Sequence, residues 1–315
     1  MSDVVTNTVE KVLLAAPRGY CAGVDRAVQT VERTLEIHGP PVYVRKEIVH
    51  NKHVVQRLRE RGVIFVERET DVPEGSVCVF SAHGVAPSVH ANAQTRGLRT
   101  IDATCPLVTK VHREALRFAE EGYTIVLVGH DGHEEVEGTM GEAPERIVLV
   151  QSEQDVDELR IEDPERIAYV TQTTLSVDET SSILARLKER FPRVVGPRTD
   201  DICYATTNRQ TAVKQLAGSC DLMLVIGSRN SSNSVRLVEV ARDCGTEAYL
   251  LDNCREVREE WLEGKRIVGV SSGASAPDEL VQDLLDFFRA RGVQDEDISE
   301  FHVIREDVRF MLPKP

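Results

Sequence analysis

The chain has 315 residues, of which 41% are hydrophobic and 29% are charged, as is typical of a folded globular protein. Its formal net charge of −14 argues against nonspecific binding to nucleic acids, because neutralising phosphates requires a basic surface. No apolar run approaches the roughly 18 residues that span a membrane. The first residues also lack a basic segment followed by an apolar stretch. We therefore expect a cytoplasmic protein that binds neither nucleic acid nor membrane.

Strands alternate with helices along the whole chain, which predicts an α/β fold with parallel sheets. The first strand, KVLLAAP, leads to a cysteine, and a helix follows with Ala27, Val31 and Leu35 on one apolar face. Next come a strand that ends in a polar loop, a second helix with a further element, and another strand that ends in a polar loop. The chain then repeats this order of elements twice more.

Each of the three copies places polar side chains at similar distances from its cysteine. One loop follows the cysteine by 28 or 29 residues, and a second loop follows it by 62 to 72 residues. The cysteines are Cys21, Cys105 and Cys203, and the loop residues are His50, His83, His133, Thr173, Ser231 and Ser275. Such agreement in three copies is hard to obtain by chance, so the pattern predicts an internal repeat.

The repeat predicts three α/β lobes in place of the two domains expected from length alone. Their ranges are 12–104, 105–200 and 201–290, followed by a tail at 291–315 that alternates like an added strand. The segment RTDD at 198–201 is interpreted as a linker between the second and third lobes.

The repeated cysteines each precede a helix, whose positive N-terminal end favours a thiolate. The chain has no Cys-x-x-Cys pair that would indicate a zinc ribbon, and Cys78 in an apolar strand is interpreted as a small buried hydrophobe. Three equivalent thiolates suggest an iron–sulfur cluster with one open iron, which would be both a Lewis acid and an electron donor. The alternative is three buried structural cysteines.

The repeated loops also predict a site for an anion at the carboxyl ends of the strands. Ser231, Ser232 and Asn233 precede a helix, whose N-terminal amides favour anions. Each serine alone would be interpreted as a helix cap. Together with the loop histidines, these hydroxyl and amide groups favour a site that holds a diphosphate without magnesium.

One carboxyl group stands near these loops. Glu135 follows His133 by two residues, on the same side of the chain if this stretch is extended. A carboxyl near an open iron and a bound anion should have a raised pKa, so it could donate protons. Glu134 and Glu137 are close by, and the sequence does not separate the three from solvated surface groups.

An acidic electron carrier would need a local basic patch on this acidic chain. Arg57, Arg59 and Arg61, or Arg96 and Arg99, are candidates for such a patch. The simpler interpretation is that these side chains are solvated helix and loop charges.

Nine segments in order resemble the family of 4-hydroxy-3-methylbut-2-enyl diphosphate reductases, which catalyse the last step of the non-mevalonate isoprenoid pathway. They are PRGYCAGVDRAV, EIVHN, SAHGVAP, DATCPLVTKVH, GHDGHEEVEGTMG, TQTTLSVDET, DDICYATTNRQ, GSRNSSNSVRL and SSGASAPDELV. The resemblance extends from about residue 12 to residue 312. The family's usual TAGAS reads SSGAS here, which leaves Ser275 in place.

The resemblance implies three pseudo-threefold-related α/β lobes, a trefoil, around one [4Fe–4S] cluster per chain. It implies that Cys21, Cys105 and Cys203 bind three irons and that Glu135 delivers protons with help from Thr173. The implied diphosphate ligands are His50, His83, His133, Ser231, Asn233 and Ser275, with Ser232 and Thr173 beside them. Reductive dehydroxylation of the allylic diphosphate would yield isopentenyl diphosphate and dimethylallyl diphosphate. The electrons would come from an external donor of the flavodoxin or ferredoxin type.

Three other functions are compatible with parts of the pattern. A hydro-lyase would use an open iron to remove water without an electron donor. A non-enzymatic iron–sulfur sensor would usually need a nucleic-acid-binding module, and the sequence shows no basic or helix-turn-helix segment. A zinc hydrolase would use the histidines, but these lie on different repeats and lack compact ligand spacing.

Overall fold

The structure is a computed structural model that describes residues 9–313, in which helices alternate with strands that pair in parallel, as predicted. The chain divides into two compact units. Unit 1 contains the described residues up to Cys21, His50–Val54 and Tyr204–Val308, and unit 2 contains Ala22–Val49, Val55–Cys203 and the described residues after Val308. No described helix is long and apolar enough to cross a membrane.

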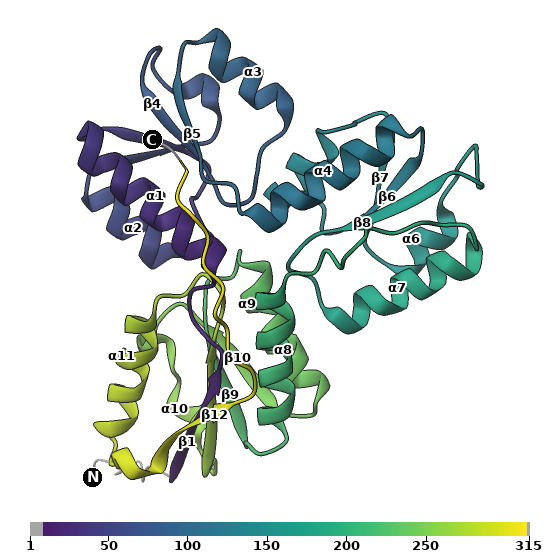
Figure 1. The fold of residues 1–315 in the computed structure, drawn as a ribbon. Coiled ribbons are helices and arrows are strands. Elements are labelled where there is room, and N and C mark those ends of the chain that lie inside the picture. The colour runs from purple at the N-terminus through teal and green to yellow at the C-terminus, as the bar shows by residue number, and fades with distance from the viewer. Residues whose placement is uncertain (1–8, 314–315) are drawn as a thin grey trace. The chain divides into compact units, whose positions relative to one another are not determined.

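Unit 1 is built on a five-stranded parallel sheet with the order β10-β9-β11-β1-β12. Its strands are β1 (Lys11–Ala16), β9 (Leu222–Ile226), β10 (Glu247–Leu251), β11 (Ile267–Ser272) and β12 (Ile298–His302). Its helices are α8 (Tyr204–Ala217), α9 (Ser232–Asp243), α10 (Glu259–Leu262) and α11 (Asp278–Arg289), with short 3₁₀ helices η2 (Cys254–Glu256) and η3 (Asp295–Asp297). Strand β9 is buried on both faces because α11 covers one face of the sheet and α8 and α9 cover the other (Figure 1).

The first sheet of unit 2 has the order β3-β2-β4-β5. Its strands are β2 (Val42–Arg45), β3 (Val63–Val66), β4 (Val77–Phe80) and β5 (Arg99–Asp102). The helices of this part of the chain are α1 (Ala22–His38), α2 (Lys52–Glu60), the short 3₁₀ helix η1 (Glu69–Asp71) and α3 (Pro87–Thr95). The predicted apolar face of α1 is buried, as is Cys78 in β4. Burial raises the pKa of the Cys78 thiol to about 12, so this cysteine stays protonated.

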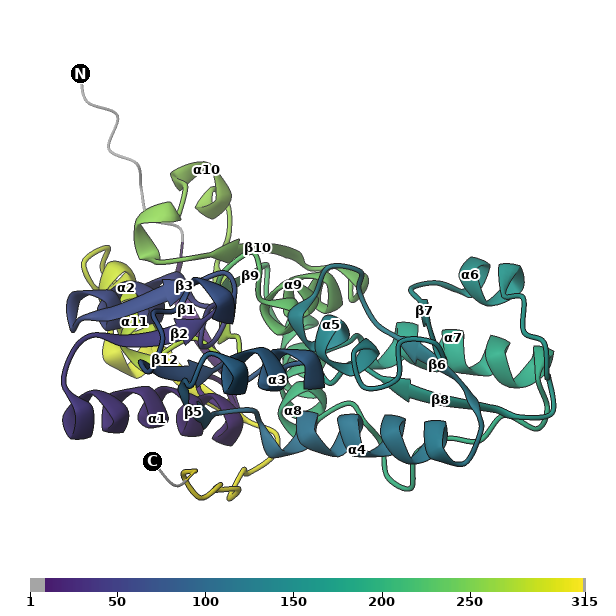
Figure 2. The ribbon, with the colours of Figure 1, turned by 90° about the horizontal axis from the view of Figure 1, so that it is seen from above.

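The second sheet of unit 2 has the order β7-β6-β8. Its strands are β6 (Thr124–Val128), β7 (Ile147–Val150) and β8 (Ile167–Thr171). The helices of this part are α4 (Pro106–Glu120), α5 (Glu134–Met140), α6 (Glu153–Glu158) and α7 (Val177–Arg190). Helices α4 and α7 cover opposite faces of this sheet (Figures 1 and 2), so alternate residues of β6 are buried against one helix or the other.

The predicted repeat is visible in the order of the strands. In each sheet, the first strand of the repeat lies between the second and the third, as in β3-β2-β4, β7-β6-β8 and β10-β9-β11. The chain before each repeated cysteine also pairs with a third strand. Before Cys105, β5 pairs with β4, and before Cys203, Val195 bridges Ala168 of β8. Before Cys21, β1 pairs with β11 in the sheet of unit 1.

In the sheet of unit 1, strand β1 therefore lies next to β11, as β5 lies next to β4 in the first sheet of unit 2. The predicted range 12–104 follows the order of the chain and assigns this strand to the first lobe. Its hydrogen bonds instead assign it to the sheet that also contains β11 and β12, because a strand joins the sheet edge with which its backbone pairs. The tail contributes β12 to the same sheet, which confirms the predicted added strand.

Candidate active site

The three repeated cysteines occupy equivalent backbone positions. Helices α1 and α8 begin directly after Cys21 and Cys203, and Cys105 is the N-cap of α4. The amides of Cys21, Cys105 and Cys203 donate hydrogen bonds to the carbonyls of Ala274, Ala82 and Thr173, at 3.1, 2.9 and 3.0 Å respectively. Each of these carbonyls lies two residues after the third strand of a repeat. None of the three cysteines forms a disulfide, and all three are half-buried.

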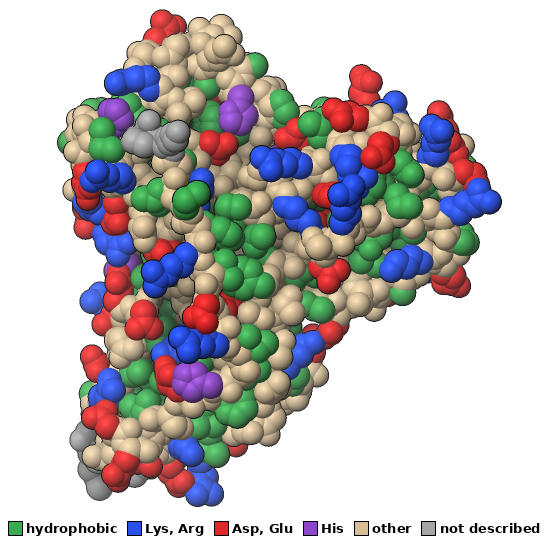
Figure 3. Space-filling model, viewed as in Figure 1, with side chains coloured by type: hydrophobic (Ala, Val, Ile, Leu, Met, Phe, Trp, Pro, Cys, Tyr) green, Lys and Arg blue, Asp and Glu red, His purple; other side chains and the backbone are tan. Residues whose placement is uncertain are grey.

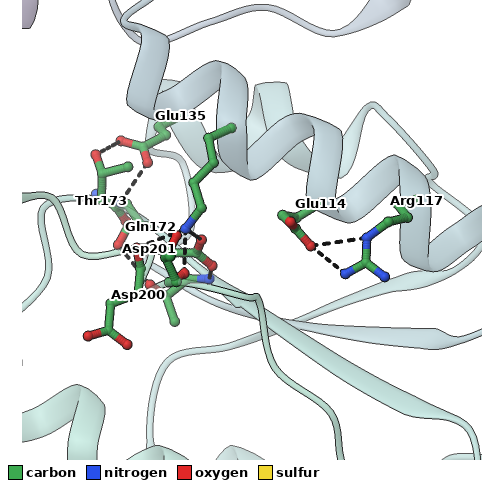
Figure 4. A network of polar contacts seen from close by, with 10 residues as sticks. Glu114, Arg117, Glu135, Gln172, Thr173, Asp200 and Asp201 are labelled. Atoms are coloured by element: carbon green, nitrogen blue, oxygen red, sulfur yellow. Dashed lines mark hydrogen bonds and ion pairs between the residues drawn. The ribbon is translucent and has the colours of Figure 1, made fainter.

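Lys110 on α4 holds the segment that precedes Cys203. Its ammonium group donates to the carboxylate of Asp201 at 2.9 Å and to two backbone carbonyls just before it. The Asp201 side chain is fully buried, and its second oxygen accepts the amide of Thr171 at 2.9 Å (Figure 4). The segment 198–201, interpreted as a linker, contains no helix or strand and precedes the change of unit after Cys203, but it ends in a buried carboxylate that the neighbouring elements satisfy.

Arg26 and Arg209 occupy similar positions on α1 and α8. Arg26 donates to the carbonyl of Thr104, next to the second repeated cysteine, at 3.0 Å. Arg209 is fully buried, donates to the carbonyl of Gly19 at 2.8 Å and pairs with Glu306 at 3.0 Å. Each cation follows one repeated cysteine by five or six residues and binds the backbone just before another. These two arginines were not among the residues predicted from the sequence, although their similar distances from a repeated cysteine could have indicated them.

In unit 1, the predicted anion-binding side chains gather after β9 and β11. Ser275 Oγ donates to the carbonyl of His50 at 2.8 Å and lies 3.4 Å from Ser231 Oγ. Ser234 Oγ donates to Ser231 Oγ at 2.9 Å. The Asn233 side-chain oxygen accepts the amide of the residue before Ser275, at 2.9 Å. These four side chains are buried, so they form a fixed polar cluster with hydroxyl and amide groups.

Close packing holds this cluster in place at the start of α9. Ser231 caps the helix by accepting the amide of Ser234, so the helix-cap interpretation also holds for it. A Cβ atom at Gly227 or Gly273 would lie 2.2 or 1.9 Å from Ser234 Oγ, so only glycine leaves room for that hydroxyl. Ser232 is the first residue of α9 and is half-buried.

In unit 2, the structure brings His83, His133 and Glu134 together. The two imidazole rings meet edge to face with centroids 5.9 Å apart, and His83 Nδ1 lies 3.0 Å from a Glu134 carboxylate oxygen. His133 is the N-cap of α5, and its Nδ1 accepts the amide of Glu135 at 3.2 Å. The condition of an extended stretch from His133 to Glu135 is not met, because His133 caps a helix that begins at Glu134.

Glu135 is the buried carboxyl group of this region, with a relative exposure of 2%. Its two oxygens accept the Thr173 amide at 2.6 Å and the Thr173 hydroxyl at 2.9 Å (Figure 4). Burial raises the pKa of Glu135 to about 7, although the two hydrogen bonds from Thr173 oppose this shift. Glu137 is exposed, and Glu134 contacts His83. Burial thus distinguishes the three glutamates that the sequence left equivalent, because Glu135 is the buried one and its pKa lies near neutral pH.

The predicted site residues therefore form one group in each unit. Unit 1 contains Cys21, His50, Ser231, Ser232, Asn233 and Ser275, and unit 2 contains His83, Cys105, His133, Glu135, Thr173 and Cys203. The sequence analysis missed His112 on α4, a buried side chain whose Nδ1 lies 2.8 Å from a Glu142 oxygen. The position of His112 beside the apolar residues of this helix could have indicated a buried histidine.

Comparisons with known proteins were made for the whole chain. A model of the family described as LytB protein matches residues 12–289. A 4-hydroxy-3-methylbut-2-enyl diphosphate reductase from Nocardia farcinica is 59% identical over 99% of this chain and 93% of its own length. A protein of the same name from Rhodococcus jostii is 58% identical over 97% and 90%.

Solved structures are similar as well. The structure of the E-1-hydroxy-2-methyl-but-2-enyl-4-diphosphate reductase from Plasmodium falciparum has a TM-score of 0.92 and 38% identity, covering 97% of this chain and 96% of that one. A structure of (E)-4-hydroxy-3-methyl-but-2-enyl diphosphate reductase, described as the terminal enzyme of the non-mevalonate pathway, has a TM-score of 0.64 and 32% identity. It covers 89% of this chain and 99% of that one.

Proposed function

The chain belongs to the LytB protein family, and on this basis we propose that it is a 4-hydroxy-3-methylbut-2-enyl diphosphate reductase. The enzyme removes the allylic hydroxyl group with two electrons and two protons, releasing water and forming isopentenyl diphosphate and dimethylallyl diphosphate. This is the terminal step of the non-mevalonate pathway. The observation that carries the proposal is the cysteine, outside any disulfide, that recurs at the start of a helix in all three repeats. We place the reaction in the cytoplasm, with an external donor of the flavodoxin or ferredoxin type.

One [4Fe–4S] cluster, held by Cys21, Cys105 and Cys203, is the proposed cofactor. The donor set fits it, because three cysteines outside any disulfide stand at helix N-termini, and cysteine sulfur is the usual ligand of such clusters. The structure describes all seven cysteines, and none of the other four begins a repeat. Among them, burial raises the pKa of Cys78 and Cys220 to about 12, which disfavours metal binding. Such a cluster, when bound, would supply electrons one at a time and a Lewis-acidic position at its open iron.

The polar cluster of unit 1 would bind the diphosphate of the substrate. The hydroxyl of Ser231 and the amide of Asn233 can donate to phosphate oxygens, and the Ser275 hydroxyl can do so when it rotates away from the His50 carbonyl that accepts it in this structure. The N-terminal amides of α9, which begins at Ser232, would add favourable partial charge. In unit 2, the imidazoles of His83 and His133 are further diphosphate ligands in this proposal, with the Thr173 hydroxyl as an additional polar contact.

Glu135 would donate a proton to the departing oxygen. With a pKa of about 7, this carboxyl group is about half protonated at neutral pH, so it can both hold and release a proton there. After the transfer, the amide and hydroxyl of Thr173 would stabilise the carboxylate, since both already donate to it. The pair therefore combines a proton source with a preformed environment for the product anion.

An anaerobic assay of the cluster-loaded protein tests the proposed reaction. Adding 4-hydroxy-3-methylbut-2-enyl diphosphate should oxidise two equivalents of reduced methyl viologen per substrate and form both five-carbon diphosphates. An intact cluster without dye oxidation would reject the reductase. Water loss from the substrate without reductant would then support the hydro-lyase, and no reaction at all would support the sensor.

The proposed role of Glu135 is tested by Glu135→Gln. This variant should bind substrate, yet its kcat should fall about 100-fold or more, as is typical when a general acid is removed. Glu137→Gln is the matched control, because Glu137 lies two residues away and is exposed. Its kcat should remain near that of the unmodified enzyme. Near-normal turnover of Glu135→Gln would reject the role.

A further inference from the structure

Unit 1 contains a cavity of about 610 Å³ whose lining is rich in arginine. The charged residues that line it are Arg229, Arg242, Arg255, Arg258 and Glu256. The Glu256 carboxylate accepts the backbone amide of Asp252 at 3.0 Å. Acidic and basic side chains are interspersed over the face drawn in Figure 3, and the chain as a whole carries −14. Arg258 pairs with Glu260 at 3.4 Å, so three arginines against one glutamate remain, and they make the cavity a local positive feature of an acidic protein.

The cavity lies among α9, β10, η2 and α10. Tyr249 of β10 stacks on Trp261 of α10 with centroids 3.8 Å apart, and Figure 2 shows these two elements next to each other. Arg258 lies over the same indole with its guanidinium carbon 5.3 Å from the ring centroid. Tyr249 thus occupies one face of the indole, which leaves less of this ring for a nucleotide base to stack on.

The arginines at the mouth of this cavity are available to a partner. Arg229 and Arg255 are exposed, and neither forms an ion pair with a described residue. Two of the candidates that the sequence suggested are already paired, since Arg57 and Arg61 lie 3.9 and 2.6 Å from a Glu32 oxygen.

A short route within unit 1 connects the cavity to a proposed cluster ligand. Val235, which lines the cavity, lies two residues after Asn233 on α9. The Asn233 side chain accepts the Ala274 amide at 2.9 Å, and the Ala274 carbonyl accepts the Cys21 amide at 3.1 Å. Half a turn of helix and two hydrogen bonds thus join the cavity wall to Cys21.

We infer that this cavity docks the acidic carrier protein that supplies the electrons, an inference that rests on the proposed function. An acidic carrier is repelled by the net charge of the chain, so it should approach where the local charge is positive. Each turnover needs two reduced carriers, each giving up one electron; one proton leaves with the hydroxyl as water, and the second adds to an allylic carbon. The exposed Arg229 and Arg255 supply the complementary charge for this encounter.

The experiment compares two electron sources on the cluster-loaded enzyme. An acidic ferredoxin, reduced by NADPH and its reductase, serves as the protein donor, and reduced methyl viologen serves as the small donor. The variant R229E/R255E should lower kcat/KM for ferredoxin at least tenfold and weaken direct ferredoxin binding, while viologen-driven turnover stays within twofold. R99E/R160E, at two exposed positions in unit 2, is the matched control with the same change in charge. It should leave ferredoxin-driven turnover within twofold.

Several results would overturn the inference. Equal losses in both double variants would show a general charge effect, and a loss confined to R99E/R160E would place the docking face elsewhere. Binding of inorganic diphosphate, but not of ferredoxin, that disappears in R229E/R255E would make the cavity a small-anion site. An enzyme inactive with viologen would instead reject the proposed function. The binding measurement would still decide the docking surface in that case.

Discussion

Replacing Glu135 by glutamine should remove a pH-dependent loss of stability. Burial raises the pKa of this carboxyl from 4.5 to about 7 in the folded chain. The folded state therefore binds the proton more tightly than the unfolded state. Stability from this group is fully present below pH 4.5 and is lost as the pH rises through 7. A glutamine has no such proton, so the variant should lack this part of the pH dependence.

The size of the effect follows from the pKa difference. A shift from 4.5 to about 7 corresponds to about 3 kcal/mol, of which roughly 2.5 kcal/mol falls between pH 5 and pH 8. The stability of Glu135→Gln relative to the unmodified chain should therefore increase by about that amount over this range. Urea unfolding under anaerobic reducing conditions, followed by circular dichroism at several pH values, measures this difference.

Glu137→Gln provides the control, because an exposed carboxyl two residues away should show little change in its effect between pH 5 and pH 8. A stability difference for Glu135→Gln that stays constant with pH would contradict the reasoning. It would mean that the carboxyl titrates similarly in the folded and unfolded chains, and that burial does not control its proton.

Three other substitutions test the contacts around the site. Lys110→Met leaves the buried Asp201 carboxylate without its cation and should cost about 3–5 kcal/mol in urea unfolding and lower the iron bound per chain, whereas Lys110→Arg should retain most of both. Arg209→Met should also lower stability and bound iron, because it leaves Glu306 without its cation and removes the hydrogen bond to the Gly19 carbonyl before Cys21; unchanged iron content would count against its positioning role. Ser275→Ala should raise KM for the substrate about tenfold with little change in kcat, and steady-state kinetics that show the reverse would exclude a pure binding role.

Much of the fold could be predicted because its signals are local. Apolar residues such as Val31, Val111 and Val213 recur at helical spacing, and all three are buried. The strands are short apolar runs that end in polar loops, so parallel pairing places those loops at one edge of each sheet. The spacing of the repeat then predicted where the cysteines and polar loops fall.

The missing parts depend on neighbours that are distant in the sequence. Glu135 differs from Glu134 and Glu137 by its burial and by its contact with Thr173, which lies 38 residues away. The burial of Asp201 at the end of the segment 198–201 could not be predicted from the sequence, because Lys110, the cation on α4 that pairs with this carboxylate, comes from a distant segment. The arginine cavity likewise assembles side chains from α9, η2 and α10, and no single stretch of sequence is conspicuously basic there.

The pairing of β1 with β11 and β12 has a consequence for synthesis on the ribosome. Residues 11–16 leave the ribosome first, but the strands on either side of them, 267–272 and 298–302, leave it near the end. The two sheets of unit 2 draw their strands from between these segments and can form earlier. The apolar strand KVLLAA must therefore remain without these partner strands while most of the protein is made. During that time of many seconds, the segment is exposed and prone to aggregation. Completion of the sheet of unit 1 is consequently a late, long-range step of folding, which a chaperone or a low growth temperature would assist.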